Sequence, residues 1–77
     1  MTYLPMPQPN FTDTFDLLGA PHGRKRWRDP NTGRLYEYDS RHGELEMYNN
    51  RGKHLGVVDV ITGEVIKTPI RGRKIDV

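Results

Sequence analysis

From residue 24 onward, apolar and polar residues alternate in short runs, and turn-forming residues separate the runs. RLYEYD (34–39) and ELEMYN (44–49) alternate most clearly, and KHLGVVDV (53–60) is the most apolar run. DPNTG (29–33), SRHG (40–43), NNRG (49–52) and ITG (61–63) are typical turn sequences. Short strands joined by short loops predict an antiparallel meander. We therefore expect a mainly β fold: a single, highly twisted antiparallel sheet of five or six strands, the last at 71–77.

The alternation also predicts which side chains form the core. Successive strand residues point to opposite faces of a sheet, so Glu44, Glu46 and Tyr48 share one face and Leu45 and Met47 the other. The carboxylates are then expected on an open face. The predicted core contains Leu45, Met47, Val58, Val60 and Val65, with either Leu35 or Tyr36.

Residues 1–23 have a different character from the rest of the chain. Prolines at positions 5, 7 and 9 favour an extended path. FTDTFDLLG (11–19) places Phe11, Phe15 and Leu18 at helical spacing, which predicts a short helical turn. The chain thus divides into a linker or helical lead-in at 1–23, which either docks on the sheet or orders only on a partner, and a domain at 24–77.

Composition limits what this domain can be. The 77 residues suffice for one domain, and the absence of cysteine excludes disulfides and thiolate metal sites. No run approaches the roughly 18 apolar residues of a membrane helix. The net charge of +2 is unevenly distributed along the chain. Residues 1–23 contain two acidic residues and no Lys or Arg, whereas residues 24–77 contain all twelve Lys and Arg.

Two basic clusters, at residues 24–28 and 71–74, favour a polyanionic partner, although an ordinary solvated surface is the alternative. Aromatic side chains beside such cations can stack on nucleic-acid bases, or they can simply fill the core of a small protein. The predicted RNA contacts are Arg24, Lys25, Arg26, Trp27, Arg28, Tyr36, Tyr38, Arg71 and Lys74.

The run YEYDSRHGELEMY (36–48) gathers four carboxylates and a histidine. One interpretation is a polar sheet face neutralised by Arg and Lys. The other is acid–base chemistry on RNA, where a base activates the 2′-hydroxyl and an acid protonates the leaving oxygen. His42 and Glu46 are four residues apart, about 13 Å along a strand, which leaves room for a phosphodiester between them. Asp39 could orient the imidazole of His42.

A metal site is a further alternative for the same residues. His42, Glu44 and Glu46 could bind a divalent cation on one face. The surrounding cations and the absence of a second clustered histidine argue against it. His54, between Lys53 and Leu55, is expected to be an ordinary surface or strand histidine.

The motifs KRW (25–27), GRLYEYD (33–39), SRHGELEMY (40–48), HLG (54–56), DVITG (59–63) and KTP (67–69), followed by Arg73, occur in one order along residues 24–77. This stretch resembles the cytotoxic ribonuclease domain of the colicins that cleave ribosomal RNA, and similar domains at the C-termini of contact-dependent inhibition toxins. The resemblance implies a twisted antiparallel sheet and a metal-independent endoribonuclease without cofactor.

The resemblance also implies a substrate and roles for particular residues. Such domains cut one phosphodiester in the decoding site of 16S ribosomal RNA and so halt translation. By this likeness Glu46 is the general base and His42 the general acid. Asp39 orients His42, Arg73 stabilises the phosphorane, and Glu44 has a supporting role.

Partners and location follow from the same resemblance. It implies a small acidic immunity protein bound to the basic surface, delivery or secretion from a producing bacterium, and action in the cytoplasm of the target bacterium. Two other functions stay open from the residues: an RNA-binding module without catalysis, and a toxin that cleaves tRNA.

Overall fold

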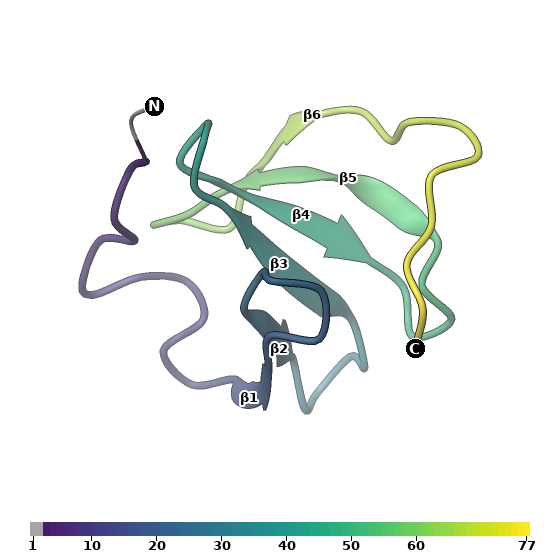
Figure 1. Cartoon of the computed structure of the whole chain (residues 1–77), viewed down its shortest axis with the longest axis horizontal. Coiled ribbons are helices and arrows are strands. Elements are labelled where there is room, and N and C mark those ends of the chain that lie inside the picture. The colour runs from purple at the N-terminus through teal and green to yellow at the C-terminus, as the bar shows by residue number, and fades with distance from the viewer. Residues whose placement is uncertain (1–2) are drawn as a thin grey trace.

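Six strands form one antiparallel sheet in the computed structural model, which describes residues 3–77 (Figure 1). Each strand pairs with the next one along the chain, so the order in the sheet is the order in the sequence. The mainly β fold and the single antiparallel sheet are thus confirmed. The strands are β1 (Asp16–Gly19), β2 (Arg26–Arg28), β3 (Leu35–Asp39), β4 (Glu44–Tyr48), β5 (His54–Asp59) and β6 (Val65–Lys67).

The first strand comes from the segment predicted to form a helical turn, and that detail of the prediction is wrong. Residues 11–14 form hydrogen-bonded turns, with the amide of Phe15 donating to the carbonyl of Thr12. Residues 16–19 then pair with β2, where Leu17 lies opposite Trp27. An isolated helical turn is marginal in water, whereas the edge of β2 offers backbone partners. Residues 1 and 2 of the lead-in lie outside the described residues.

One face of the sheet carries the apolar core. Its cluster contains Trp27, Tyr36, Leu45, Met47, Val58 and Val60. The N-terminal segment covers this face, because Phe11 and Phe15 pack against the ring of Tyr36 at centroid distances of 5.5 and 5.4 Å. The segment therefore docks on the sheet. Of the two candidates, Tyr36 joins this cluster, whereas Leu35 is buried outside it.

Val65 is a second correction. It was expected in the core, but it is 61% exposed on the edge strand β6. At the same end of the chain, residues 71–77 do not form the predicted strand. Their strand-like pairing is limited to an isolated bridge between Lys53 and Lys74. The sixth strand of the sheet is instead β1, at the opposite edge.

The other face is polar and is partly covered by the C-terminal segment, which runs past the start of β5 (Figure 1). The amide of Ile75 donates to the carbonyl of Gly52 (2.9 Å), and Arg26 donates from Nη1 to the carbonyl of Asp76 (2.7 Å). The side chain of Arg26 is itself buried and ion-paired with Glu37. The carboxylate face is consequently not open as expected, and a cleft remains where the segment does not reach. No helix in residues 3–77 has the length and apolarity to cross a membrane.

Candidate active site

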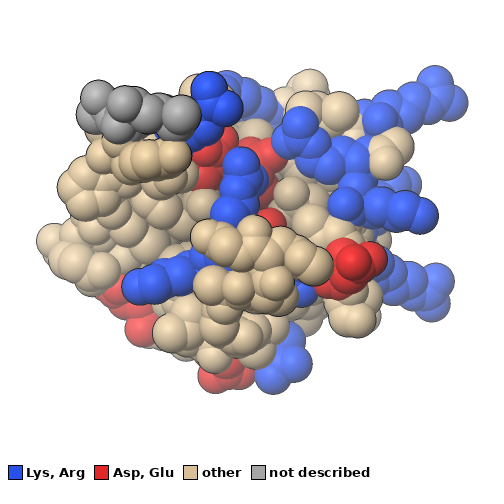
Figure 2. Space-filling view, in the orientation of Figure 1, with Lys and Arg blue, Asp and Glu red and all other residues tan. Residues whose placement is uncertain are grey.

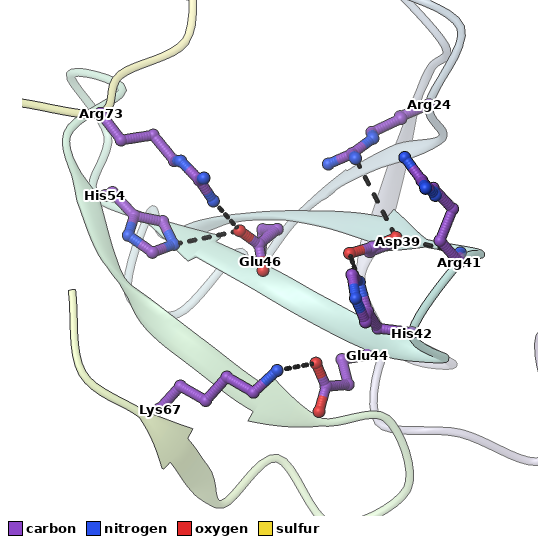
Figure 3. A network of polar contacts seen from close by, with 9 residues as sticks. All are labelled: Arg24, Asp39, Arg41, His42, Glu44, Glu46, His54, Lys67 and Arg73. Atoms are coloured by element: carbon purple, nitrogen blue, oxygen red, sulfur yellow. Dashed lines mark hydrogen bonds and ion pairs between the residues drawn. The ribbon is translucent and has the colours of Figure 1, made fainter. Parts of the chain in front are cut away.

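A cleft of about 350 Å³ opens on the polar face, above β4. Its walls bring together every residue for which the sequence predicted a catalytic or supporting role, although β3, β4, the turn between them and the C-terminal segment all contribute (Figure 3). The lining residues are Arg24, Asp39, Arg41, His42, Glu44, Glu46, Tyr48, Val57, Lys67, Ile70 and Arg73.

One wall is the turn from β3 to β4. Asp39 ends β3, and its Oδ2 lies 2.7 Å from Nδ1 of His42. The other carboxylate oxygen accepts the amide of Arg41 (3.0 Å), and the carbonyl of Asp39 accepts the amide of Gly43 (2.8 Å). A short carboxylate side chain of this kind stabilises its own turn. The imidazole of His42 is therefore held through Nδ1, while its side chain remains 62% exposed beside the cleft.

The electrostatics of this wall favour an ionised Asp39. Burial by itself would raise the pKa of the carboxyl group. The contact with His42, the amide of Arg41 and the charge of Arg24 outweigh burial and lower the pKa of Asp39 below its ordinary value. Asp39 is thus an anion that can accept from Nδ1 of His42 and stabilise the imidazolium form.

The opposite wall is centred on Glu46, whose side chain is almost fully buried. Arg73 donates from Nη1 to Oε1 of Glu46 at 2.5 Å, and Nε2 of His54 lies 3.3 Å from the same oxygen. Within residues 3–77 no side chain donates to the other oxygen, Oε2. The C-terminal segment thus brings a guanidinium directly to the carboxylate, across 27 residues of sequence.

His54 corrects an expectation. Of the two alternatives expected for it, the strand is confirmed, because His54 begins β5, and the surface is wrong, because His54 is 1% exposed and faces Glu46. A β-bulge explains this orientation. Met47 pairs with Gly56 and Tyr48 pairs with His54, so Leu55 is an extra residue in β5. The extra residue reverses the alternation and turns His54 to the cleft face. The signal in the sequence was the isolated glycine of HLG, since Gly inside a strand pattern indicates a bulge.

Burial also sets the charge of this histidine. Desolvation is the largest effect and lowers the pKa of His54, and the charge of Arg73 acts in the same direction. Glu46 opposes both effects, but the pKa remains below the ordinary value. His54 is accordingly a neutral imidazole near neutral pH.

Glu44 closes the lower side of the cleft. Its Oε1 accepts a hydrogen bond from Nζ of Lys67, on β6, at 2.9 Å (Figure 3). This bond raises the pKa of Lys67. Lys67 thus lines the cleft as a further cation, beside Arg24, Arg41 and Arg73.

Several residues predicted to bind RNA are placed elsewhere. Arg26 is buried with Glu37, and Trp27 and Tyr36 belong to the apolar core, so these three side chains do not face solvent as RNA contacts require. Tyr38 is partly buried and donates its hydroxyl to the carbonyl of Leu4. Arg28 is exposed and lies 3.7 Å from Asp16, away from the residues that line the cleft.

The remaining predicted contacts lie in or near the cleft. Arg24 lines it, 4.0 Å from Asp39, and Lys25 is exposed beside it in the chain. Arg71 and Lys74 line a neighbouring groove of about 510 Å³ together with Arg51 and Lys53, which the sequence did not single out. In the space-filling view, Lys and Arg gather on the side of the C-terminal segment, and carboxylates lie deeper between them (Figure 2).

The metal-ion alternative finds no support in the geometry. Within the described part of the chain, no three His, Asp or Glu side chains converge as the ligands of an ion would. His42 contacts Asp39, Glu44 contacts Lys67 and Glu46 contacts Arg73, so the three suggested ligands turn to different partners.

The sequence of the chain matches a known protein family. The family model named Cytotoxic matches residues 13–76, which is most of the chain, and the chain belongs to that family. The match also takes in β1, which the motifs had not covered.

Curated relatives from Escherichia coli place the chain more closely. It is 47% identical to colicin E3, 45% to cloacin and 43% to colicin E6, in each case over 53 residues or 68% of the chain. The resemblance to the cytotoxic domains of this group of colicins is therefore confirmed. The chain spans only about a tenth of the length of these relatives, since the aligned part is 10% of colicin E3 and 9% of cloacin.

Proposed function

We propose that this domain is a metal-independent endoribonuclease that cleaves 16S ribosomal RNA in the decoding site. The observation that carries the proposal is the pairing of two unlike walls around one cleft. An exposed imidazole held by a carboxylate stands on one side, and a buried carboxylate with a guanidinium stands on the other.

The wall of Glu46 suits the base and the phosphate site. Oε2 of Glu46 is available to take the proton of a ribose 2′-hydroxyl while Oε1 is held by Arg73. The guanidinium of Arg73 is 43% exposed, so it can contact a phosphate as well as the carboxylate. Its fixed positive charge is placed where negative charge develops on the phosphorane.

The wall of His42 suits the acid. With Nδ1 bound to Asp39, Nε2 is the nitrogen left to donate a proton toward the cleft. Ionised Asp39 stabilises the imidazolium and fixes its orientation. Glu44 supports the site by holding Lys67 near the substrate backbone.

The reaction then balances with the residues present. Glu46 removes the 2′-hydroxyl proton, the 2′-oxygen attacks the adjacent phosphorus, and Arg73 stabilises the phosphorane. His42 gives its proton to the departing 5′-oxygen. The products are a 2′,3′-cyclic phosphate and a free 5′-hydroxyl, and no metal is needed to activate the nucleophile.

The choice of the ribosome as target rests on the family and on the group of colicin relatives. The same relationship supports an acidic immunity protein as partner, release from a producing bacterium, and action in the cytoplasm of a target bacterium. The basic groove of Arg51, Lys53, Arg71 and Lys74 offers complementary charge to RNA or to such a protein.

The test is to incubate intact ribosomes with the protein and to separate the RNA on a denaturing gel. A single 3′ fragment of 16S RNA with a 5′-hydroxyl end is expected, with His42→Ala as the inactive control. Cleavage should persist in EDTA. Intact RNA despite tight binding would instead indicate a binding module, and preferential cleavage of free tRNA would indicate the other toxin class.

A further inference from the structure

His54 connects the two groups on which the base wall depends. Its Nε2 lies 3.3 Å from Oε1 of Glu46. Its Nδ1 accepts a hydrogen bond from the amide of Ile70 (2.9 Å), and its own amide donates to the carbonyl of Arg73 (3.1 Å). One residue of β5 thereby contacts the carboxylate on β4 and the segment that carries the guanidinium.

The contact with Ile70 fixes the tautomer of the ring. A backbone amide can only donate, so Nδ1 must present a lone pair. A neutral imidazole carries its single proton on one nitrogen, and here that nitrogen is Nε2. The proton therefore lies on the buried nitrogen 3.3 Å from Oε1 of Glu46, where the N–H attracts the carboxylate electrostatically although it is not aligned for a hydrogen bond.

We propose that His54, as a neutral imidazole protonated at Nε2, is a positioning residue that holds Glu46 and Arg73 in a fixed mutual arrangement. The inference rests on the proposed ribonuclease function for its catalytic consequence. With 1% of its surface exposed, His54 does not touch substrate and acts only through its neighbours. The bulge at Leu55–Gly56 is what allows a residue of β5 to take this position.

Protonation of His54 would undo the arrangement. Both ring nitrogens would then be donors, and Nδ1 would face the amide of Ile70 without an acceptor. The groups around the ring are Glu46 and Tyr48 from β4 and Arg73 from the C-terminal segment. Of these, Glu46 favours the charged ring, whereas Arg73 and burial oppose it.

Three substitutions separate the two contacts. His54→Asn keeps an acceptor for the amide of Ile70 but is too short to reach Glu46. His54→Gln keeps an N–H group near Glu46 but places no acceptor at the position of Nδ1, opposite the amide of Ile70. His54→Leu loses both, and we expect its kcat on ribosomes to fall roughly 100-fold with KM unchanged, because misplacement of catalytic groups affects the chemical step. His54→Asn and His54→Gln should each recover about tenfold of that loss.

Controls make the outcome decisive. His22→Leu, at an exposed histidine with a 65% exposed side chain, should leave kcat unchanged. A kcat for His54→Leu within about threefold of wild type, or no recovery in Asn and Gln, would overturn the proposal. A purely structural role would lower the folded fraction, measured by near-UV circular dichroism, without lowering kcat per folded molecule.

A measurement on the unmodified protein covers the case in which His54→Leu does not fold. Long-range proton–nitrogen spectra of the imidazole should show a proton on Nε2 and none on Nδ1 at neutral pH. A proton on Nδ1 would overturn the proposal. This result does not depend on cleavage, so a wild-type protein that leaves ribosomal RNA intact would defeat the proposed function while the tautomer still tests His54.

Discussion

The two walls of the cleft are built in different ways. The wall of His42 is local, because a single turn of five residues supplies Asp39, the imidazole and the backbone contacts that hold them. The wall of Glu46 is assembled from β4, β5 and the C-terminal segment, so its parts meet only when the whole sheet has formed. The acid is thus organised by turn chemistry, and the base by tertiary packing.

The largest effects are expected from removing the acid or the base itself. His42→Ala and Glu46→Gln should each reduce kcat/KM by about 10²- to 10⁴-fold, the usual contribution of a positioned acid or base. Because the side chain of His42 is exposed, the free energy of unfolding of His42→Ala should lie within about 0.5 kcal/mol of the wild-type value. Thermal melts and gel assays on the same preparations provide the measurement. Loss of folding in His42→Ala would show that the turn is structural rather than catalytic.

Removal of the guanidinium should come next in size. Arg73→Ala is expected to lower kcat by roughly 100-fold, because the charge is lost where the phosphorane forms. Binding of ribosomes should weaken less, since Arg51, Lys53, Arg71 and Lys74 remain. Cosedimentation compared with single-turnover cleavage separates the two quantities. Arg71→Ala is the matched control, and equal losses of binding and cleavage in Arg73→Ala would make Arg73 a docking contact.

A substitution outside the cleft should disturb only the base wall. Gly52 has a φ of +87°, and an added Cβ would overlap the carbonyl oxygen of Ile75, whose amide is bonded to Gly52. Gly52→Ala should cost about 1–3 kcal/mol of stability and shift the segment that carries Arg73. The contact of His42 with Asp39 should persist, so the nuclear magnetic resonance chemical shifts of the His42 ring should be unchanged. Gly23→Ala, where φ is +83° but no atom lies within 4 Å, is the control for backbone strain alone.

The smallest effect concerns pH. The pKa of His54 is lowered in the folded state, so the unfolded chain binds the proton more readily. The corresponding stability is present above the ordinary value of 6.5 and is lost as the pH falls through the lower, folded pKa. Urea unfolding at a series of pH values should show this loss in wild type and not in His54→Gln. The pKa of Asp39 is also lowered, and its contribution is lost only in stronger acid, below its ordinary 3.8.

The contrast between the walls also explains what the sequence could predict. Alternation in ELEMY identified Leu45 and Met47 as core, and DSRHG contained the acid wall within a few residues. The position of Arg73 was available only through family resemblance, because no local pattern brings it 27 residues back to Glu46. His54 was missed because its contact with Glu46 depends on a bulge in β5, which simple alternation along the strand does not predict.

The sequence also did not predict which side chains of the basic run 24–28 are buried. Arg26 belongs to a basic run, yet it turns inward to Glu37 and to the carbonyl of Asp76. Trp27 lies between exposed and buried cations and fills the core. Successive residues of a strand point to opposite faces of the sheet, so the cations of one run are divided between the two faces. The number of Lys and Arg in the run therefore overestimates the number that can contact RNA.

The turn at 39–43 has a consequence for protein engineering. Since the hydrogen bonds that hold Asp39 and His42 are internal to the turn, an unrelated hairpin of matching geometry should accept these five residues as a transplant and hold the ring in the same pose. Such a chimera would contain the proposed acid, His42, without the proposed base, Glu46. The graft would lack Glu46, whose position depends on β5 and the C-terminal segment. The contacts of the base wall could then be added to the graft one at a time, and the effect of each could be measured.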